Sequence, residues 1–192
     1  MKNEGKIIVT THSDIIWKAA RIGATKRKNG DKCIEGNLDN LVCVAEIIYD
    51  VIPRIHDTNI KFYFTSEEET TMKGAKEVLR REGKALYVVI DVTQSGNGSD
   101  VNVEWPYNIN IAELKKALAN LDYRISFERG SRDETKVFGK KYPTFSLNLP
   151  IKGRIHGRGR VSSEKVKRFG EAVCEILKIA RKKYGKICEF ND

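Results

Sequence analysis

The sequence predicts an α/β protein with three layers, α/β/α, in which helices cover both faces of a mostly parallel or mixed central sheet. Short segments rich in β-branched and aromatic residues alternate with segments whose apolar residues have helical spacing. Most of the short segments are too apolar to bury one face only, as in sheets covered on both sides. The 192 residues, 40% of them hydrophobic, fit one domain with a sizeable core, so we expect residues 1–192 to form a single domain.

Six segments have the composition of strands, and Pro106, with Asn108, is expected to separate the fourth from the helix that follows it. The expected strands are Lys6–Thr11, Ile60–Thr65, Ala85–Val92, Val101–Trp105, Tyr123–Phe127 and Thr144–Leu149.

Four segments have apolar residues at helical spacing. They are Leu38–Ile52, Thr70–Arg81, Ile111–Leu121 and Ser163–Lys183. Pro53 is expected to stop the first helix, and Ser162 or Ser163 is a good N-cap for the last. Of the remaining segments, Ile22–Asn37 indicates a loop or a small hairpin, whereas Ser95–Ser99 and Lys152–Arg160 indicate loops.

The charge and hydropathy of the chain bear on several classes of function. A net charge of +9 favours nucleic-acid binding only weakly, because the Lys and Arg clusters are dispersed and match no nucleic-acid-binding motif. Solvated faces explain them, and a basic rim could also attract acidic substrates. No apolar run reaches the roughly 18 residues of a membrane span, and the start lacks the features of a signal peptide. We therefore expect a soluble, cytoplasmic protein that binds neither membranes nor nucleic acid.

The four cysteines show no Cys-x-x-Cys spacing. Cys43 and Cys174 lie on apolar helix faces, where a reduced cysteine behaves as a small hydrophobic residue. We expect all four to be non-catalytic and unpaired.

Residues that can bind metals follow several of the expected strands, and the carboxyl ends of parallel strands form the edge where ligands bind in open α/β sheets. Each alone has an ordinary explanation, such as a hydrogen-bonded histidine or a carboxylate at a helix start. Together, the carboxylates would repel one another strongly unless cations compensated them. A mixture of imidazole and carboxylate suits zinc or a neighbouring divalent metal. The residues are His12, Asp14, Asp39, Glu67, Glu68, Glu69, Asp91 and His156.

These residues lie within five motifs that occur in the order typical of one enzyme family. The motifs are Thr11-His12-Ser13-Asp14, Gly36-Asn37-Leu38-Asp39-Asn40, Thr65-Ser66-Glu67-Glu68-Glu69-Thr70-Thr71-Met72-Lys73-Gly74-Ala75, Asp91-Val92-Thr93 and Arg154-Ile155-His156. The set resembles the co-catalytic zinc exopeptidases, and most closely the tetrahedral and glutamyl aminopeptidase family. This resemblance implies a zinc-exopeptidase-like, phosphorylase/hydrolase-like fold.

The resemblance also implies a role for each matched residue. His12 and Asp91 would bind one divalent metal ion, Glu69 and His156 the other, and Asp39 would bridge both. The two ions would be zinc, with cobalt or manganese as alternatives, and would share a hydroxide. Glu68 would be the general base, because aligning Gly74-Ala75 with the family motif assigns that role to Glu68 rather than to Glu67. Asp14 would orient the imidazole of His12. The implied reaction removes one residue from the amino end of a peptide.

The sequence departs from the family pattern without losing a ligand. Thr71 replaces a glycine, and Leu38 replaces an acidic residue. Only residues 13–38 separate His12 from Asp39, where the family inserts a dimerisation domain. We therefore expect a single catalytic domain without dimerisation or lid domains, which makes a dodecameric shell doubtful although oligomers remain possible. Ser131-Arg132-Asp133 is a candidate for the family's Gly-Thr-Asp turn near the substrate pocket.

Two other functions remain open. The same centre could attack the amide of a small N-acyl compound, which would make the protein a metal-dependent deacylase. A relative that retains the metal site could instead be a non-catalytic binding or regulatory module. Retention of every ligand and of the base argues against that module.

Overall fold

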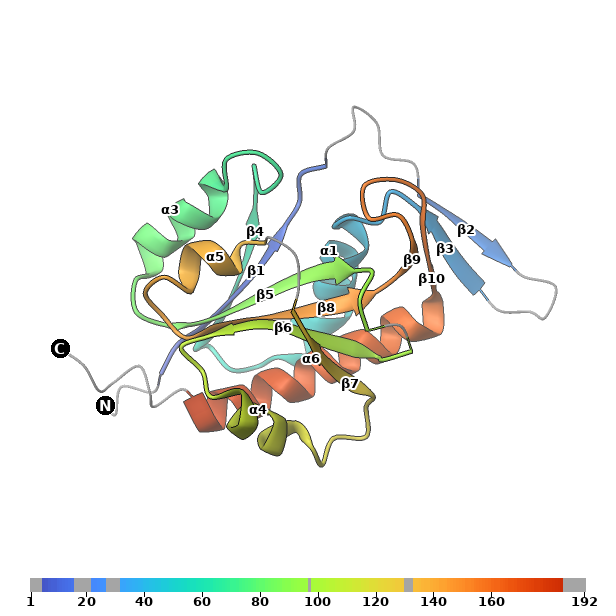
Figure 1. The fold of residues 1–192 in the computed structure, drawn as a ribbon. Coiled ribbons are helices and arrows are strands. Elements are labelled where there is room, and N and C mark those ends of the chain that lie inside the picture. The colour runs from blue at the N-terminus through green and yellow to red at the C-terminus, as the bar shows by residue number, and fades with distance from the viewer. Residues whose placement is uncertain (1–4, 16–21, 27–31, 97, 130–132, 185–192) are drawn as a thin grey trace.

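The computed structural model describes residues 5–15, 22–26, 32–96, 98–129 and 133–184 (Figure 1). Its main sheet has six strands, and the pairs β4–β1, β1–β5, β5–β8 and β6–β7 are parallel whereas β6–β8 is antiparallel. In spatial order the strands are β4 (Ile60–Thr65), β1 (Ile7–His12), β5 (Leu86–Thr93), β8 (Thr144–Pro150), β6 (Val101–Tyr107) and β7 (Ile125–Glu128). All six expected strands are therefore present.

Helices cover both faces of this sheet (Figure 1). Helices α3 (Lys73–Glu82) and α5 (Thr135–Phe138) pack on one face, and the other face is covered by α1 (Leu41–Glu46), η1 (Ile47–Val51), α2 (Ile52–Arg54), α4 (Ile111–Leu118) and α6 (Ser163–Tyr184). Alternate residues of β1 enter different cores, because Ile7 and Val9 contact the larger cluster and Ile8 the smaller one. The predicted α/β class with a mostly parallel, mixed sheet is thus confirmed.

A second sheet of four antiparallel strands adjoins the first (Figure 1). Its order is β2 (Ile22–Lys26), β3 (Lys32–Gly36), β10 (Gly159–Ser162) and β9 (Lys152–Gly153). The expected small hairpin is present as β2 and β3. The expectation of a simple loop over Lys152–Arg160 was wrong at both ends, because these residues pair with each other and with β3.

Two prolines lie inside elements that they were expected to end. Pro53 lies within the last helical turn, α2, and the chain becomes extended only at Ile55. Pro106 lies in β6 at an irregularity of the β6–β8 ladder between Glu104 and Tyr107. A residue without an N–H is tolerated where the ladder is interrupted. The short helix α5 was not predicted.

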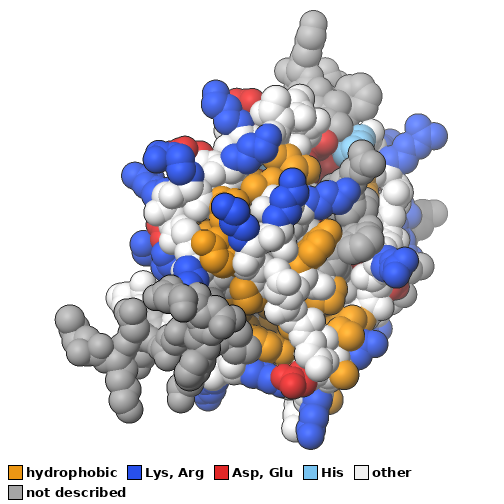
Figure 2. All heavy atoms as spheres, turned by 60° about the vertical axis from the view of Figure 1, so that its left-hand side comes forward, with side chains coloured by type: hydrophobic (Ala, Val, Ile, Leu, Met, Phe, Trp, Pro, Cys, Tyr) orange, Lys and Arg blue, Asp and Glu red, His pale blue; other side chains and the backbone are white. Residues whose placement is uncertain are grey.

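Two features of the structure relate to nucleic-acid binding and to membrane insertion. Figure 2 shows Lys and Arg side chains scattered among hydrophobic ones on the face that it draws, rather than gathered into one patch. Within the described ranges, every helix is too short or too polar to cross a membrane.

Candidate metal centre

The predicted ligands meet at the carboxyl-terminal edge of the main sheet. His12 is the last residue of β1, Asp91 lies near the end of β5, and the loop after β4 carries Glu68 and Glu69. The other two come from the small sheet, because Asp39 follows β3 and His156 lies between β9 and β10. They line a cavity of about 570 Å³, together with Val92, Gln94, Arg154 and Ile155. This volume is ordinary for a small-molecule site.

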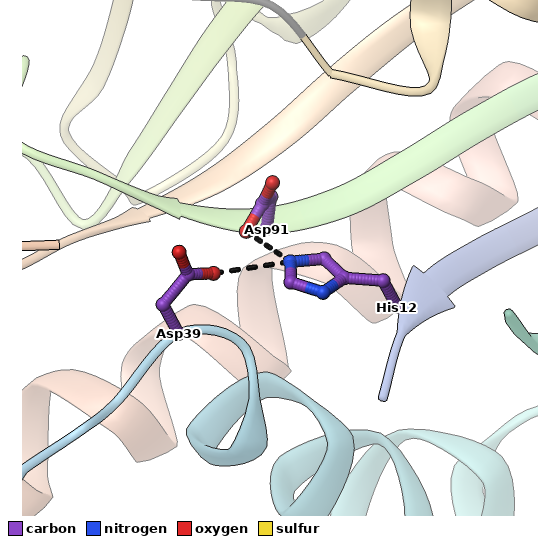
Figure 3. Close-up of side chains that lie close together, drawn as sticks. All are labelled: His12, Asp39 and Asp91. Carbon is purple, nitrogen blue, oxygen red and sulfur yellow. Dashed lines mark hydrogen bonds and ion pairs between the residues drawn. The ribbon is translucent and has the colours of Figure 1, made fainter. Parts of the chain in front are cut away.

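One cluster forms around the buried imidazole of His12 (Figure 3). Its Nε2 atom lies 3.0 Å from Asp39 Oδ1 and 3.5 Å from Asp91 Oδ1. Burial alone lowers the pKa of His12, but Asp91 and Asp39 outweigh burial and raise it to about 12. The two carboxylates therefore strongly favour a positive charge on the imidazole of His12.

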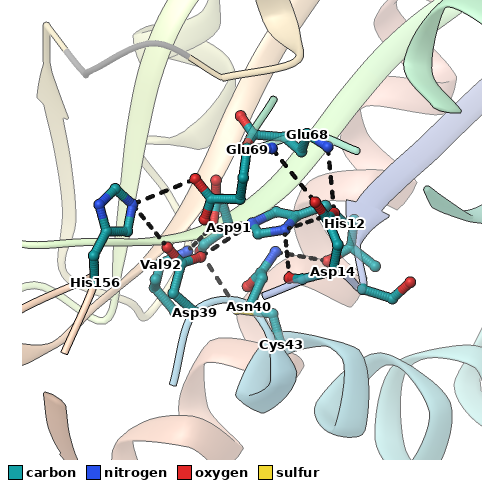
Figure 4. A network of polar contacts seen from close by, with 12 residues as sticks. His12, Asp14, Asp39, Asn40, Cys43, Glu68, Glu69, Asp91, Val92 and His156 are labelled. Carbon is teal, nitrogen blue, oxygen red and sulfur yellow. Dashed lines mark hydrogen bonds and ion pairs between the residues drawn. The ribbon is translucent and has the colours of Figure 1, made fainter. Parts of the chain in front are cut away.

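A second cluster forms around His156, whose side chain is half exposed (Figure 4). Its Nε2 atom lies 3.4 Å from Asp39 Oδ2 and 3.6 Å from Glu69 Oε2. The two oxygens of the Asp39 carboxylate thus face different histidines. In each cluster, potential ligand atoms from three residues lie within 4.8 Å of one another.

A tight corner after β4 presents the two glutamates. Glu67 and Met72 have positive φ values of 60° and 53°, which delays the start of α3 from the expected Thr70 to Lys73. Gly74 donates its N–H to Ser66 O at 3.0 Å, and a Cβ at Gly74 would lie 2.5 Å from Ser66 N. The position therefore requires glycine, because any side chain would collide with the backbone that carries the corner.

Asp14 connects β1 to this corner (Figure 4). His12 Nδ1 lies 3.2 Å from the backbone oxygen of Asp14 and 3.4 Å from its Oδ1. The Asp14 carboxylate also accepts the backbone N–H groups of Glu68 at 3.3 Å and Glu69 at 3.5 Å. The contact expected with the imidazole is present, whereas the contacts with the corner were not anticipated.

Asn40 fixes the backbone next to Asp39, a role that its sequence motif did not reveal. It is fully buried, and its Nδ2 donates to Thr11 Oγ1 and to Ile90 O, both at 2.8 Å. The peptide bond between Asp39 and Asn40 is cis. Through its two donated hydrogen bonds, Asn40 attaches the start of α1 to β1 and β5.

Burial makes the carboxylates of Glu68, Glu69 and Asp91 harder to ionise. Burial first, and then the charge of Asp91, raise the pKa of Glu68 to about 8. Burial raises the pKa of Asp91 to about 7, and burial and Asp39 also raise that of Glu69. Carboxylates assembled at such a cost fit divalent ions, which compensate negative charge and suit imidazole and carboxylate ligands. The residues present therefore fit a metal site.

The remaining residues singled out in the sequence are the cysteines and the segment Ser131-Arg132-Asp133. Cys43 and Cys174 are on buried helix faces, as expected, and Cys188 lies outside the described residues. Ser131 and Arg132 also lie outside them. Asp133 is buried before α5 and accepts a hydrogen bond from Thr135 N at 2.8 Å. Because the other two residues of the turn lie outside the described ranges, the place of Asp133 in a substrate turn stays a prediction.

The fold is shared with a class of solved enzymes, the TET and M18-family aminopeptidases. An aminopeptidase from the archaeon Desulfurococcus kamchatkensis matches with a TM-score of 0.68 and 14% identity, covering 86% of this chain and 54% of that one. The TET1 peptidase of Pyrococcus horikoshii matches with a TM-score of 0.64 and 17% identity, covering 82% of this chain and 52% of that one.

An M18-family aminopeptidase from Thermotoga maritima matches with a TM-score of 0.58 and 12% identity, covering 81% of this chain and 48% of that one. The chain thus spans about half the length of the solved structures that it matches. No family model matches the sequence, and a search of curated proteins finds no match. At these identities the likeness establishes the fold, which agrees with the resemblance inferred from the motifs.

Proposed function

We propose that this chain is a metal-dependent aminopeptidase that hydrolyses the first peptide bond of its substrate. The observation that carries the proposal is the Asp39 carboxylate, whose two oxygens face His12 and His156 separately. Around it lie Asp91 and Glu69, so two three-residue ligand sets share one bridging residue. That the fold is found in aminopeptidases supports the same reaction.

In this proposal His12 and Asp91 would hold one divalent ion, Glu69 and His156 would hold the other, and Asp39 would contribute to both. When bound, such a pair polarises the scissile carbonyl and lowers the pKa of an attacking water. Zinc suits this mixture of imidazole and carboxylate best, and cobalt and manganese are close substitutes.

Glu68 would serve as the general base. It lines the cavity, and its carboxylate lies within 4.8 Å of potential ligand atoms of His12 and Glu69. Glu68 takes one proton from the water as the oxygen attacks the carbonyl carbon, and passes it to the amine when the C–N bond breaks. Its pKa of about 8 without metal shows how strongly this pocket favours the protonated form. Asp14 holds His12 and the corner of Glu68 in register.

The same proposal extends to organisation and location. We propose that residues 1–192 act as one catalytic domain in the cytoplasm. The solved TET1 peptidase is described as assembling into a tetrahedron or an octahedral shell. Here the hairpin β2–β3 lies where the family inserts its dimerisation domain, so we propose that a dodecameric shell does not form. Light scattering on the purified protein measures this directly.

A panel of aminoacyl reporter amides and their N-acetylated versions, assayed with zinc, cobalt and manganese, tests the reaction. We expect bound metal and hydrolysis of the free-amino set. Hydrolysis of only the blocked set would instead identify a deacylase, and bound metal without any hydrolysis would identify a binding module. If no metal binds even after zinc or cobalt is supplied, the proposal is wrong.

A further inference from the structure

Two carboxyl groups meet where α1 becomes the π-helical turn η1. Glu46 is the last residue of α1, and Asp50 lies one helical turn later in η1. Gly170 of α6 faces both of them, because a Cβ at Gly170 would lie 2.1 Å from Glu46 Oε1 and 3.0 Å from Asp50 Oδ2. The two oxygens are therefore neighbours in the contact between η1 and α6. We call Glu46 and Asp50 the carboxyl pair.

The carboxyl pair requires a proton. Glu46 Oε1 and Asp50 Oδ2 are buried, and within the described residues neither atom has a hydrogen-bond donor. Asp50 Oδ1 accepts a hydrogen bond from Arg54 Nη2 at 2.6 Å, which leaves Oδ2 to accept a second one. Two ionised carboxylates have no donor to offer each other, so one of them must carry a proton. Burial first, and then Asp50, raise the pKa of Glu46 to about 7, so Glu46 is the group that carries it.

The surroundings of the carboxyl pair do not cancel a second negative charge. The titratable and charged groups around it on α1, α2 and α6 are Cys43, Arg54, Lys167, Glu171, Cys174, Glu175 and Lys178. The last two bind each other at 2.7 Å, and burial raises the pKa of both thiols, which keeps them neutral near pH 7. Arg54 also contacts Glu171 at 3.9 Å, whose other partner is Lys167 at 3.8 Å. An ionised Glu46 would therefore share one arginine with Asp50 and Glu171.

We propose that the carboxyl pair is a pH-sensitive clamp, which holds α1 and η1 against α6 while Glu46 carries a proton and loosens this contact when the proton is lost. In the closed form Glu46 donates its O–H to Asp50, and Gly170 leaves the space that the two oxygens occupy. After the proton leaves, two carboxylates repel each other in a half-buried contact between helices. Because Asp39 directly precedes Asn40, the N-cap of α1, the clamp holds a helix that begins at the candidate metal centre.

Local opening of the clamp should depend on pH through one proton. The pKa of Glu46 is about 7 in the closed form and about 4.3 when exposed, so opening releases a proton between these two values. The clamp therefore stabilises the contact fully below about pH 4.3 and is lost as the pH rises through about 7. Hydrogen exchange, corrected for the intrinsic rate, measures this opening. We expect the protection of the Ile47–Val51 amides to fall about tenfold or more between about pH 5 and pH 8.

Three variants separate the clamp from other sources of pH dependence. Glu46→Gln keeps a hydrogen-bond donor for Asp50 but cannot ionise, so it should remove most of the fall in protection. Glu113→Gln is the matched control, because its side chain is 57% exposed and pairs with Lys183, and it should retain the fall. Gly170→Ala places a methyl group against Glu46 Oε1, so it should lower the protection at pH 5 towards the value that the unmodified protein has at pH 8.

A carbon-13 NMR titration of the Glu46 carboxyl group in the unmodified protein tests the proton directly. We expect a midpoint near pH 7. A midpoint near that of an exposed glutamate, or the same fall in protection in Glu46→Gln as in the unmodified protein, would overturn the clamp. Neither measurement needs a metal ion or a substrate, so the clamp is tested independently of the proposed aminopeptidase activity.

Discussion

The pKa values of buried carboxylates shift in opposite directions at the two edges of the main sheet. At the amino-terminal edge, Glu82 contacts Lys6 at 2.9 Å and Lys61 at 3.2 Å, and accepts a hydrogen bond from Tyr63. Burial opposes ionisation there, but Tyr63 and the two lysines outweigh it and lower the pKa of Glu82 to about 2. This carboxylate therefore stays charged, in a chain with 35 Lys and Arg residues that supplies ample partners.

At the carboxyl-terminal edge, the ion pairs described for Asp39, Glu69 and Asp91 are with His12 and His156. Burial and mutual repulsion raise the pKa of Glu68 to about 8 and that of Asp91 to about 7. The same chain that neutralises Glu82 with two lysines compensates Glu68 and Asp91 only in part, through His12. The contrast indicates that the second edge can accept more positive charge than the polypeptide itself provides there.

The largest expected effect concerns Glu68, the proposed general base at the carboxyl-terminal edge. Glu68→Gln should lower kcat by about 10² to 10⁴, the usual contribution of a general base, while the metal content stays unchanged. Glu67→Gln is the matched control, because the Glu67 side chain is 42% exposed and pairs with Lys73 at 3.6 Å. Steady-state kinetics with elemental analysis measures both. A larger loss in Glu67→Gln than in Glu68→Gln would show that the assignment is off by one residue.

Metal binding should stabilise the protein by supplying the missing positive charge. With free zinc at 100 times Kd, the free energy of unfolding should rise by about 2.7 kcal/mol. For a domain of this size the melting temperature should then rise by roughly 5 to 10 °C. Asp39→Asn should lose most of this shift, because Asp39 faces both histidines, whereas the exposed Asp122→Asn should retain it. Calorimetry that finds equal shifts in both variants would contradict the bridging role.

Removing a carboxylate should change the free energy of unfolding in opposite directions at the candidate metal centre and at a carboxylate with basic partners. Asp100 is 1% exposed and contacts Arg124 at 3.1 Å and Arg168 at 3.2 Å, so Asp100→Asn should destabilise the protein by about 1–3 kcal/mol. In the metal-free protein at neutral pH, Glu68→Gln should instead increase the free energy of unfolding. Urea denaturation measures both values. Destabilisation of the metal-free protein by Glu68→Gln would end the contrast between the two kinds of carboxylate.

The smallest effect concerns the acid limb of the stability curve. Because the pKa of Glu82 is lowered to about 2, its ion pairs stabilise the fold fully above the unfolded pKa of about 4.3. That stability is lost as the pH falls from there through about 2. Glu82→Gln should cost about 1 kcal/mol at neutral pH and should weaken the pH dependence between these limits. An unchanged acid limb in denaturation curves would show that Lys6 and Lys61 do not hold this charge.

The sequence predicts the main sheet well because its strands and helices alternate with clear periodicity. Of the small sheet it indicates only the hairpin β2–β3, because β10 pairs with β3, and Cys33 and Ser162 meet only in the tertiary structure. Candidate ligands could be proposed because each lies in a motif at or after the end of a strand, and the motifs occur in the order typical of one family. Asn40 could not, because its role depends on Thr11 and Ile90, which other strands bring to it.

The pairing of Gly36 with Gly159 has a mechanical consequence for the centre. Asp39 and His156 both extend from the small sheet, whereas His12, Asp91 and Glu69 belong to the large one. A hinge rotation of the hairpin layer would displace two donors of one pocket but a single donor of the other. Cations bound in the two proposed pockets would consequently exchange at unequal rates, and the one between Glu69 and His156 would leave first.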